Sequence, residues 1–438
     1  MFFNVLYAVA LVLYSPVILY RRLRHGRYRR GWRQKLLGLN AAEALALTSG
    51  KPCIWLHAVS VGEVNLLRGI VSELDDRKDS LAVVISTSTD TGYDLAVKQY
   101  GAERVFFCPL DFSWAVDRTL RHLNPEALVL AELELWPNLI HASKKCGSPV
   151  VVINGRLSDT SAARYRRFGA LTRPVFRSLS RIECQDESSA VNFALCGAPA
   201  DRIQVSGSLK FDNAPSSRDS IEVQSRVAWT GLDPWQVVWM VGSTQEGEDA
   251  MALAVYNRLR GRFKELRMIL VPRHPERFNQ VAAEIEASGL VAHRRSRDGS
   301  LDELSWEGDR VILVDTVGEL RHWWGVCQLA TVGGSFGDRG GQNMLEPAGY
   351  GCAISFGPNT KNFRHIAEEL LRSDAAVRVQ GESELERFVE SCLVNIPRAD
   401  SLGRNARAAV QQHRGATERV LLSLNTILAP VTPQRSAA

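Results

Sequence analysis

The sequence lacks any pair of cysteines at the spacing of a metal site. Its 438 residues include 8 cysteines, which are scattered without a CxxC motif, as Cys53, Cys108, Cys146 and Cys327 illustrate. Scattered cysteines in a chain of this length are typical of reduced core residues in a cytosolic protein. The sequence therefore gives no support to a structural zinc site.

Two familiar nucleotide-binding fingerprints are also absent. No glycine-rich stretch leads into the GK[ST] of a P-loop, and no GxGxxG of a dinucleotide-binding domain occurs. Short repeats and low-complexity tracts are missing as well, whereas 45% hydrophobic and 23% charged residues are ordinary for a globular protein. The length predicts two or three domains.

Charged side chains are missing from residues 1–20, MFFNVLYAVALVLYSPVILY. About 20 apolar residues suffice to cross the hydrocarbon core of a bilayer. Asn4 and Pro16 weaken this segment, so a tilted or partly embedded helix is an alternative to a full span. We predict that residues 1–20 are a membrane anchor; the other interpretation is an ordinary buried first helix.

Acidic side chains are missing from the next stretch. The formal net charge of +5 comes from a run of basic residues without acidic neighbours: Arg21, Arg22, Arg24, Arg27, Arg29, Arg30, Arg33 and Lys35. Because this run follows the apolar segment, the pattern does not fit a cleavable signal peptide. The positive-inside rule places the body of the protein in the cytoplasm, with a basic segment at residues 21–50 on an anionic membrane surface. Nucleic-acid binding is disfavoured, since the run lacks a recognition motif.

Apolar strand-like segments alternate with helical patterns through the rest of the chain. Their continuous Val, Ile and Leu character is typical of parallel sheets covered on both faces. The segments are 52–60, 81–89, 104–110, 127–134, 150–156, 181–185 and 203–208, followed by 237–242, 267–273, 291–295, 310–315, 329–333, 353–356 and 376–379. Two such series predict an α/β fold with two Rossmann-like, doubly wound domains that face a central cleft.

The expected domain boundaries follow from composition. We predict an N-terminal domain at 51–213, a polar linker at 214–228 and a C-terminal domain at 229–415. Residues 416–430 have an amphipathic pattern, so we expect a helix that crosses back to pack on the N-terminal domain.

The stretch Cys53–Val64, CIWLHAVSVGEV, passes from a buried apolar run through small residues into a helical pattern. In open α/β sheets, ligands bind at the carboxyl ends of strands, beside helix N-termini. Glu63 at this place is a candidate general base. The alternative is a structural role in the first helical turn, where a carboxylate complements the helix dipole.

Polar side chains also end two later strands of the first half. Ala131–Asn138, AELELWPN, brings two carboxylates, and Asn154–Ser158, NGRLS, brings Asn154 and Arg156. Burying carboxylates without partners is costly, so a solvated functional edge is favoured. Helix capping by these residues is the alternative.

The second half has the features of an anion-binding module. Gly242–Asp249, GSTQEGED, follows a strand with a Ser–Thr pair, and Arg273 ends another strand, where a guanidinium suits a carboxylate or phosphate. Residues 315–320, DTVGEL, bring backbone amides through Gly318 to the same edge. Gly333–Pro347, GGSFGDRGGQNMLEP, is glycine-rich and then turns helical, so we expect its N–H groups to approach a phosphate.

The order of these motifs resembles the Kdo (3-deoxy-D-manno-octulosonic acid) transferases of Gram-negative bacteria, glycosyltransferase family 30. The resemblance extends from the apolar segment to about residue 416 and rests on HAVSVGEV at 57–64, ELELWPN at 132–138, NGRLS at 154–158, GSLKFD at 207–212, GSTQEGE at 242–248, PRHPERF at 272–278, DTVGEL at 315–320, GGS at 333–335 and NMLEPA at 343–348. It implies the GT-B architecture and transfer of Kdo from CMP-Kdo to the glucosamine disaccharide of a lipid A precursor (lipid IVA). The expected place is the cytoplasmic surface of the bacterial inner membrane.

The same resemblance implies roles for individual residues. It makes Glu63 the general base and Glu132 a second essential carboxylate. It implies that the acceptor is contacted by Ser60, Asn154 and Arg156, and that CMP-Kdo is held by Ser243, Thr244, Arg273, Gly318, Asn343 and Glu346. No DxD pair stands at a strand end in the second half, so we predict that the reaction needs no metal, and we expect no cofactor. Glu63 would take the proton of an acceptor hydroxyl that attacks the face opposite the leaving CMP, so we predict inversion.

Three positions depart from the family pattern. Leu133 stands where ETELWPN has threonine, Ser208 where GNLKFD has asparagine, and Gln342 where histidine is common. Glutamine still forms hydrogen bonds, so Gln342 bears on the geometry of the phosphate or acceptor and not on the reaction class.

Two other functions remain open from the sequence. One is a GT-B enzyme that uses a UDP-sugar on a lipid-linked acceptor. The other is a membrane-tethered binding protein without catalysis, against which Glu63, Glu132 and Arg273 argue.

Overall fold

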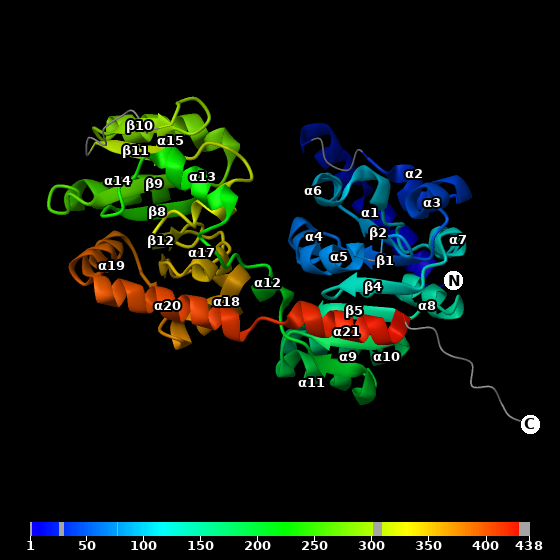
Figure 1. Ribbon diagram of the computed structural model, residues 1–438. Coiled ribbons are helices and arrows are strands. Elements are labelled where there is room, and N and C mark those ends of the chain that lie inside the picture. Colours follow the sequence, from blue (N-terminus) through cyan, green and yellow to red (C-terminus); the bar gives the residue numbers. More distant parts are fainter. Residues whose placement is uncertain (1, 26–29, 77, 301–308, 429–438) are drawn as a thin grey trace, which may run out of the picture. The chain divides into compact units, whose positions relative to one another are not determined.

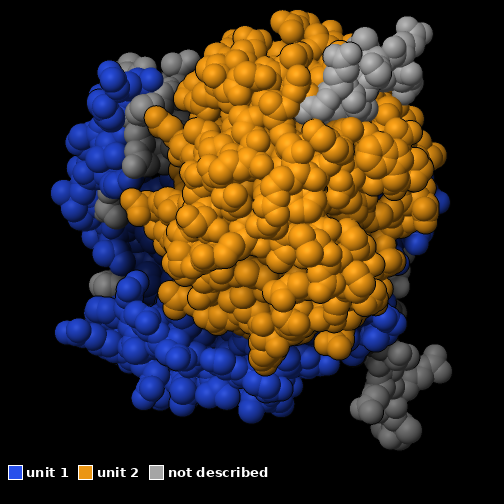
Figure 2. All heavy atoms as spheres, turned by 90° about the vertical axis from the view of Figure 1, so that its left-hand side faces the viewer, with its two compact units in different colours: residues 1–213, 414–438 blue, residues 214–413 orange. Residues whose placement is uncertain are grey.

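The structure is a computed structural model that describes residues 2–25, 30–76, 78–300 and 309–428 (Figure 1). The chain forms two compact α/β units. Unit 1 consists of residues 1–213 and 414–438, and unit 2 consists of residues 214–413 (Figure 2). Each unit has its own 7-stranded sheet, which confirms the predicted class of two Rossmann-like α/β domains.

The sheet of unit 1 is parallel throughout. Its strands are β1 (Cys53–His57), β2 (Ala82–Thr87), β3 (Val105–Phe107), β4 (Ala127–Ala131), β5 (Val150–Gly155), β6 (Arg181–Cys184) and β7 (Ile203–Val205). They lie in the order β3-β2-β1-β4-β5-β6-β7. Neighbouring residues of one strand point to opposite faces, so Trp55 belongs to one buried core and Ile54 to the other. This two-sided burial explains the continuous apolar runs.

Helices cover both faces of this sheet (Figure 1). They are α1 (Phe2–His25), α2 (Trp32–Leu37), α3 (Ala41–Thr48), α4 (Val61–Leu66), α5 (Arg68–Asp75), α6 (Asp90–Tyr100), α7 (Ser113–Leu123), α8 (Pro137–Lys145), α9 (Asp159–Arg167), α10 (Gly169–Ser178), α11 (Glu187–Leu195), α12 (Leu209–Asp212) and α21 (Ala416–Leu428). Side-chain caps set several of their starts. Ser60, Thr89, Ser158 and Asp186 each accept a backbone N–H from the first turn of the following helix.

Helix α1 contacts unit 1 through its first turns. Asn4 exchanges hydrogen bonds with Ser113, at 2.7 Å to the hydroxyl group and 3.0 Å from the backbone N–H, and accepts one of 3.0 Å from Asn138 Nδ2. The polar residue that interrupts the apolar segment thus has partners on helices α7 and α8. In the described part of the chain, no helix combines the length and apolar character of a membrane-crossing segment. The anchor at residues 1–20 stays a prediction.

Part of the basic run is bound within unit 1. Arg30 pairs with Asp94, and Arg33 pairs with Glu43 of α3. Lys35 is buried, with its ammonium group 4.4 Å from the ring centre of Phe107. These three side chains therefore make contacts within unit 1, which the sequence did not reveal. The basic residues Arg27 and Arg29 lie outside the described residues.

The sheet of unit 2 is also parallel and 7-stranded, but its fourth strand in chain order lies between the second and the third. Its strands are β8 (Val237–Thr244), β9 (Leu266–Pro272), β10 (Val291–Arg294), β11 (Arg310–Leu313), β12 (Leu329–Val332), β13 (Ala353–Phe356) and β14 (Ala376–Arg378). They lie in the order β10-β11-β9-β8-β12-β13-β14, all parallel. The helices are α13 (Ile221–Thr230), α14 (Glu248–Leu259), α15 (Phe278–Ala287), α16 (Leu320–Trp323), α17 (Leu345–Tyr350), α18 (Arg364–Arg372), α19 (Glu382–Val394) and α20 (Ile396–Gln412).

The stretch predicted as a linker, residues 214–228, is part of unit 2. The guanidinium group of Arg218 donates to three backbone carbonyls, those of Gly325 and Cys327 at 2.7 Å and that of Tyr350 at 3.1 Å. Helix α13 begins within the same stretch. The polar composition of this stretch suggested a linker, but one of its polar residues, Arg218, holds the stretch to unit 2 by hydrogen bonds.

Helix α21 belongs to unit 1 although it follows unit 2 in the chain. Its Ala416, Val420 and Leu424 lie in the same buried core as Ile54 and Val129. Asp212 accepts hydrogen bonds from the backbone N–H groups of Gly415, at 2.8 Å, and Thr417, at 2.5 Å. The amphipathic pattern of residues 416–428 thus marks a helix that packs on unit 1, while residues 429–430 lie outside the described residues.

Candidate active site

The carboxyl ends of β1 and β4 form the point at which the strand order of unit 1 reverses. From β1 the sheet extends to β2 and β3, and from β4 it extends in the other direction to β5, β6 and β7. The loops after β1 and β4 diverge at such a point, which is where open α/β sheets usually bind ligands. Glu63 follows β1 and Glu132 follows β4, so the two predicted catalytic carboxylates flank it.

Glu63 is fixed by the loop that precedes helix α4. The hydroxyl group of Ser60 accepts the Glu63 N–H at 3.5 Å and donates to Glu63 Oε1 at 2.8 Å. The backbone N–H of Val59 donates to Oε2 at 2.7 Å. Only 9% of Glu63 is exposed. The Ser60 hydroxyl group thus caps α4, and together with the Val59 N–H it holds the Glu63 carboxylate in one orientation.

The surroundings of Glu63 favour its protonated form more than water does. Burial raises the pKa of Glu63 above its usual range, and the negative charge of Glu132 adds to the rise. The hydrogen bonds from Val59 and Ser60 and the charge of Lys210 lower the pKa in part. A raised pKa gives a carboxylate the proton affinity that a general base needs.

Glu132 has a backbone conformation that is uncommon for an L-residue. Its φ angle is 58°, in the left-handed region. Strained residues of this kind cluster at functional sites. Its carboxylate Oε1 lies 3.2 Å from the ammonium nitrogen of Lys210 and accepts a hydrogen bond of 3.4 Å from Asn154 Nδ2. The side chain remains 31% exposed, so Glu132 is both paired and accessible.

Asn154 connects the two sides of this pair. It is fully buried, and its side-chain Oδ1 accepts the Leu209 N–H at 3.0 Å and the Ser208 hydroxyl at 3.3 Å. Through these contacts it fixes the start of α12, which carries Lys210, beside Glu132. The contacts of Asn154 are therefore those of a positioning residue, whereas the sequence predicted contact with the acceptor.

The other two predicted acceptor residues differ in exposure. Ser60 already uses its hydroxyl group on Glu63, as described above. Arg156 is exposed on the loop after β5. Arg156 is thus the one of the three that is open to a ligand.

Two functional candidates were quoted only as parts of motifs, namely Lys210 in GSLKFD and Glu134 in ELELWPN. Burial raises the pKa of Glu134 to about 7, and the charge of Glu63 is the next largest cause. Trp136 Nε1 donates to Glu134 Oε2 at 3.0 Å. The positive charge of Lys210 in GSLKFD could have identified it as a partner for a carboxylate. The sequence does not show that this carboxylate is Glu132, because the two residues meet only in the folded sheet.

The strand order of unit 2 reverses between β8 and β12, and a buried carboxylate occupies that point. Glu248, the first residue of α14, is 4% exposed. Its two oxygens accept backbone N–H groups from Gly334 at 2.7 Å and from Ser335 and Phe336 at 3.1 Å each. The Gln245 N–H donates to it as well, at 2.8 Å. These glycine-loop amides were expected to meet a phosphate, but the protein itself supplies their anion.

The Ser–Thr pair after β8 is buried. Thr244 is fully enclosed and donates its hydroxyl proton to Asp249 Oδ1 at 2.5 Å. Asp249 also pairs with Arg277. Ser243 is 5% exposed and has a φ angle of 60°. The Thr244 hydroxyl that was predicted to bind the donor thus serves the interior of unit 2, and Ser243 marks a strained turn at the strand end.

The remaining predicted donor residues lie on loops at the carboxyl ends of strands. Arg273 follows β9 with an exposed guanidinium group that forms no salt bridge within the described ranges. Gly318 follows β11 with a φ angle of 91°, which favours glycine. Asn343 caps the approach to α17 by accepting the Leu345 N–H at 3.1 Å, and donates to Glu346 at 3.2 Å. Each unit thus carries its predicted residues at the carboxyl edge of its sheet.

Across the described residues, no group of three or more His, Cys, Asp or Glu side chains is arranged to hold a metal ion. The carboxylates of Glu63, Glu132 and Glu134 are engaged by Ser60, Lys210 and Trp136, respectively.

Comparison with known proteins gives a consistent family. The family model of the 3-deoxy-D-manno-octulosonic-acid transferases (kdotransferase) matches residues 28–213. The 3-deoxy-D-manno-octulosonic acid transferase of Haemophilus influenzae is 33% identical over 372 residues, which cover 84% of this chain and 85% of the relative. The transferase of the same name from Bordetella pertussis is 34% identical over 382 residues, covering 85% and 86%.

The fold is shared more widely. The crystal structure of UDP-GlcNAc 2-epimerase from Neisseria meningitidis bound to UDP-GlcNAc has a TM-score of 0.58 over 85% of this chain and 100% of that chain, at 10% identity. At this identity the likeness concerns the fold alone. The two relatives described above, each aligned over at least 85% of its own length, establish that this chain belongs to the family of Kdo transferases, which are glycosyltransferases.

Proposed function

We propose that the enzyme transfers Kdo from CMP-Kdo to the glucosamine disaccharide of a lipid A precursor in lipopolysaccharide biosynthesis. Family membership supports the sugar that is transferred. The observation that carries the mechanism is the group of Glu63, Glu132 and Lys210 at the strand reversal of unit 1. It combines a buried carboxylate of raised proton affinity with an accessible carboxylate and a cation.

Glu63 is proposed as the base for the acceptor hydroxyl. As the hydroxyl oxygen bonds to the anomeric carbon of Kdo, its proton passes to a carboxylate oxygen of Glu63, and the bond from that carbon to the phosphate oxygen of CMP breaks. Attack and departure on opposite faces invert the anomeric configuration. The capping hydrogen bonds from Val59 and Ser60 keep the carboxylate oriented, which spares the cost of ordering it during reaction.

Lys210 and Glu132 are proposed to set the charge at this base. Without Lys210, two carboxylates near each other would hold a proton more tightly, since like charges disfavour ionisation. The Lys210 ammonium group lies 3.2 Å from Glu132, which offsets the charge that Glu132 presents to Glu63. The positive charge of Lys210 thus limits the rise in the pKa of Glu63 that burial and Glu132 cause.

Arg273 is proposed to bind the phosphate of the donor. Its exposed guanidinium group suits bidentate contact with phosphate oxygens and with the negative charge that CMP gains on leaving. Asn343 and Glu346 are proposed to hold the remaining parts of CMP-Kdo. Glu248 acts indirectly, because it shapes the glycine loop from within unit 2.

The proposal includes a place at the cytoplasmic surface of the bacterial inner membrane. Helix α1 exposes large apolar side chains along its length, with Val12 at 70%, Leu13 at 75% and Tyr20 at 58% exposure. Such an exposed apolar stretch is typical of a membrane or protein contact. A lipid acceptor stays in the bilayer, so tethering raises the effective concentration of enzyme and acceptor.

The test is a reconstituted transfer reaction. Purified full-length enzyme receives CMP-Kdo and a tetra-acylated lipid A precursor, and mass spectrometry reads the lipid product. We expect the mass of the acceptor to rise by one or more Kdo units. Parallel reactions with UDP-sugars serve as the control for donor identity. Transfer from a UDP-sugar with none from CMP-Kdo would refute the proposal.

A further inference from the structure

An apolar pocket of about 500 Å³ lies on unit 1, and none of the residues assigned above lines it. It is formed by helix α1, the segment after β4 and the helix pair α9–α10, and its apolar walls include Phe3, Leu6, Leu135, Phe168, Leu171 and Val175. This volume is within the usual range for small-molecule sites. The pocket is thus large enough for part of a ligand and is built from side chains that favour hydrocarbon.

Several wall residues expose apolar surface to solvent. Leu6 is 51% exposed, Phe168 is 57% exposed and Leu171 is 43% exposed. Exposing three large apolar side chains around one hollow is unfavourable in water unless something covers them, so such patches mark binding sites. Fully burying a leucine side chain is favourable in free energy, so covering these residues would strengthen the binding of an apolar ligand.

The helices that form the pocket are strongly basic. Residues 159–178 contain one acidic residue, Asp159, and five arginines: Arg164, Arg166, Arg167, Arg173 and Arg177. None of the five forms a salt bridge with another residue in the described part of the chain. Arg164 itself lines the apolar pocket. The pocket therefore opens into a region of uncompensated positive charge.

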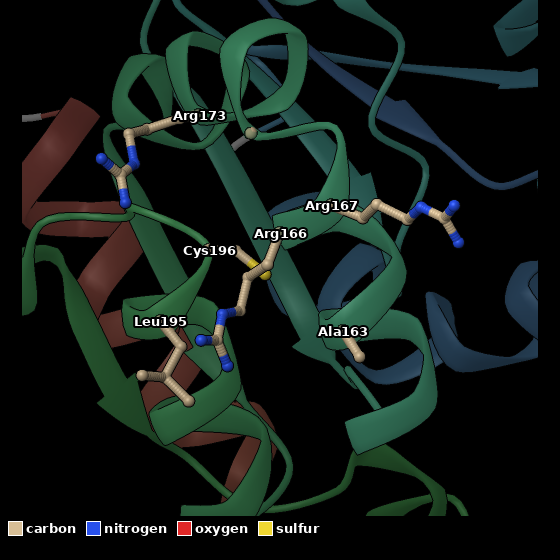
Figure 3. Close-up of a pocket in the computed structure, with 7 residues that line it drawn as sticks. Ala163, Arg166, Arg167, Arg173, Leu195 and Cys196 are labelled. Atoms are coloured by element: carbon tan, nitrogen blue, oxygen red, sulfur yellow. The ribbon is translucent and has the colours of Figure 1, made fainter.

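The arginines are spread over the surface and do not form a single anion site. A second hollow of about 590 Å³ is lined by Arg166, Arg167 and Arg173. Figure 3 shows that the Arg167 guanidinium group points away from those of the other two. Consecutive residues of a helix point about 100° apart, which explains the divergence of Arg166 and Arg167. Such an arrangement attracts anionic groups of a large ligand at several points.

The pocket is close to the candidate active site along the chain. Leu135 is a wall residue, and it follows Glu132 by three positions. Three residues of backbone span at most about 11 Å. A ligand that reaches Glu132 with its polar part can therefore place an attached chain in the pocket.

We propose that this pocket binds one acyl chain of the anionic lipid acceptor and that the α9–α10 arginines attract its phosphate groups. The proposal rests on the proposed function, since it takes the acceptor to be an acylated, phosphorylated disaccharide. The apolar walls fit the acyl chain and the five unpaired arginines fit the anionic head. An ordinary bilayer phospholipid is the competing occupant, and the first experiment separates the two.

The first experiment maps the bound chain directly. The acceptor is prepared with a photoreactive diazirine on one acyl chain, irradiated with the full-length enzyme, and the labelled residues are identified by mass spectrometry. We expect labels on α1 and on α9–α10. Excess vesicles of phosphatidylethanolamine and phosphatidylglycerol, added as competitor, should leave this labelling in place. Labels confined to other surfaces of unit 1, or loss of labelling to the vesicles, would overturn the proposal.

The second experiment uses a charged substitution in the pocket wall. Leu171→Asp should raise the KM for the acylated acceptor about tenfold or more, because the apolar contact between Leu171 and the bound acyl chain is lost. The KM for CMP-Kdo should stay unchanged, which shows that the variant is folded. Leu45→Asp, on the exposed side of α3, is the matched control and should leave both constants unchanged. An unchanged acceptor KM in Leu171→Asp contradicts the pocket, whereas absence of transfer by the unaltered enzyme contradicts the proposed function.

Discussion

The two units use the same point of the same fold in opposite ways. In unit 1, the loops at the strand reversal present carboxylates, of which Glu132 is 31% exposed and paired with Lys210. In unit 2, the corresponding loops are closed upon each other, because buried Glu248 accepts three backbone N–H groups of the glycine loop. The position of the strand reversal is thus common to both, but the carboxylate of Glu132 is accessible there in unit 1, whereas that of Glu248 is buried in unit 2.

This difference shows that a glycine-rich loop at a strand end need not be a phosphate loop. The glycines of residues 333–341 allow the chain to approach Glu248 closely, and a side chain on Gly333 would come within 2.7 Å of the Glu248 carboxylate. The same backbone freedom that admits a phosphate elsewhere admits an internal carboxylate here. Donor binding in unit 2 is therefore expected from exposed groups such as Arg273 and not from these amides.

The largest expected effect comes from Glu63, the proposed base in unit 1. Glu63→Gln keeps the shape and one oxygen to accept the Val59 N–H but removes the carboxylate that takes the proton, so turnover should fall by roughly 10²–10⁴-fold, as is usual for a lost general base. Affinity for CMP-Kdo should be retained. Steady-state kinetics and calorimetric titration with CMP-Kdo measure the two quantities.

The control for this variant is Glu73→Gln, an exposed glutamate on α5 of the same unit. It should turn over like the unaltered enzyme. If Glu63→Gln also kept near-normal turnover, the contrast between an open catalytic site in unit 1 and a closed one in unit 2 would fail.

The second effect tests the closed site of unit 2. Glu248→Ala leaves the N–H groups of Gly334, Ser335 and Phe336 without an acceptor, and unsatisfied buried donors cost about 1–3 kcal/mol each. We expect the free energy of unfolding of unit 2 to drop by roughly 3 kcal/mol and the affinity for CMP-Kdo to weaken. Urea unfolding and titration with CMP-Kdo measure these effects.

Glu248→Gln sharpens the same test, since one carbonyl oxygen remains to accept hydrogen bonds. It should recover part of the lost stability, while Glu246→Gln, an exposed neighbour, should change neither quantity. Tighter CMP-Kdo binding in Glu248→Ala would instead mean that the amides are a phosphate site blocked by Glu248, and the two units would then be alike.

The smallest effect concerns pH and the carboxylates of unit 1. The pKa of Glu134 is raised from 4.5 to about 7, so the folded state binds its proton more tightly than the unfolded state does. Its contribution to stability is full below about pH 4.5 and is lost as pH rises through about 7. Glu134→Gln should reduce the pH dependence of the free energy of unfolding by ~1–2 kcal/mol over this window.

Urea unfolding at about pH 5 and at about pH 8 measures this dependence. The exposed Glu126→Gln is the control and should retain the slope of the unaltered enzyme. A slope unchanged by Glu134→Gln would show that the carboxylates of unit 1 are better solvated than their burial indicates.

The sequence predicts the architecture well because burial on both faces of a sheet leaves a local signature. Each predicted apolar segment overlaps one strand of the structure, from Cys53–His57 to Ala376–Arg378. The order of strands has no such signature: β11 lies between β10 and β9, which sequence proximity does not indicate. The contacts of the predicted linker have no local signature either, since its polar Arg218 donates to carbonyls more than 100 residues away.

The candidate site was predictable where a residue acts beside its own loop. Glu63 and Ser60 are three positions apart, so the cap and the carboxylate are visible in the sequence. Lys210 and Glu132 are brought together by Asn154, and Glu248 meets its amides across 86 to 88 residues. Such partners are chosen by the folded sheet, and the sequence alone does not identify them.

Helix α21 has a consequence for how the nascent chain matures. Its Ala416, Val420 and Leu424 are each 0% exposed in a core whose other members precede Asn213. Domains usually fold in the order in which they emerge from the ribosome. Here all of unit 2, residues 214–413, leaves the ribosome before helix α21, which completes the core of unit 1. During that interval the part of the unit 1 core that α21 covers is exposed, and this apolar surface is one that a chaperone can bind.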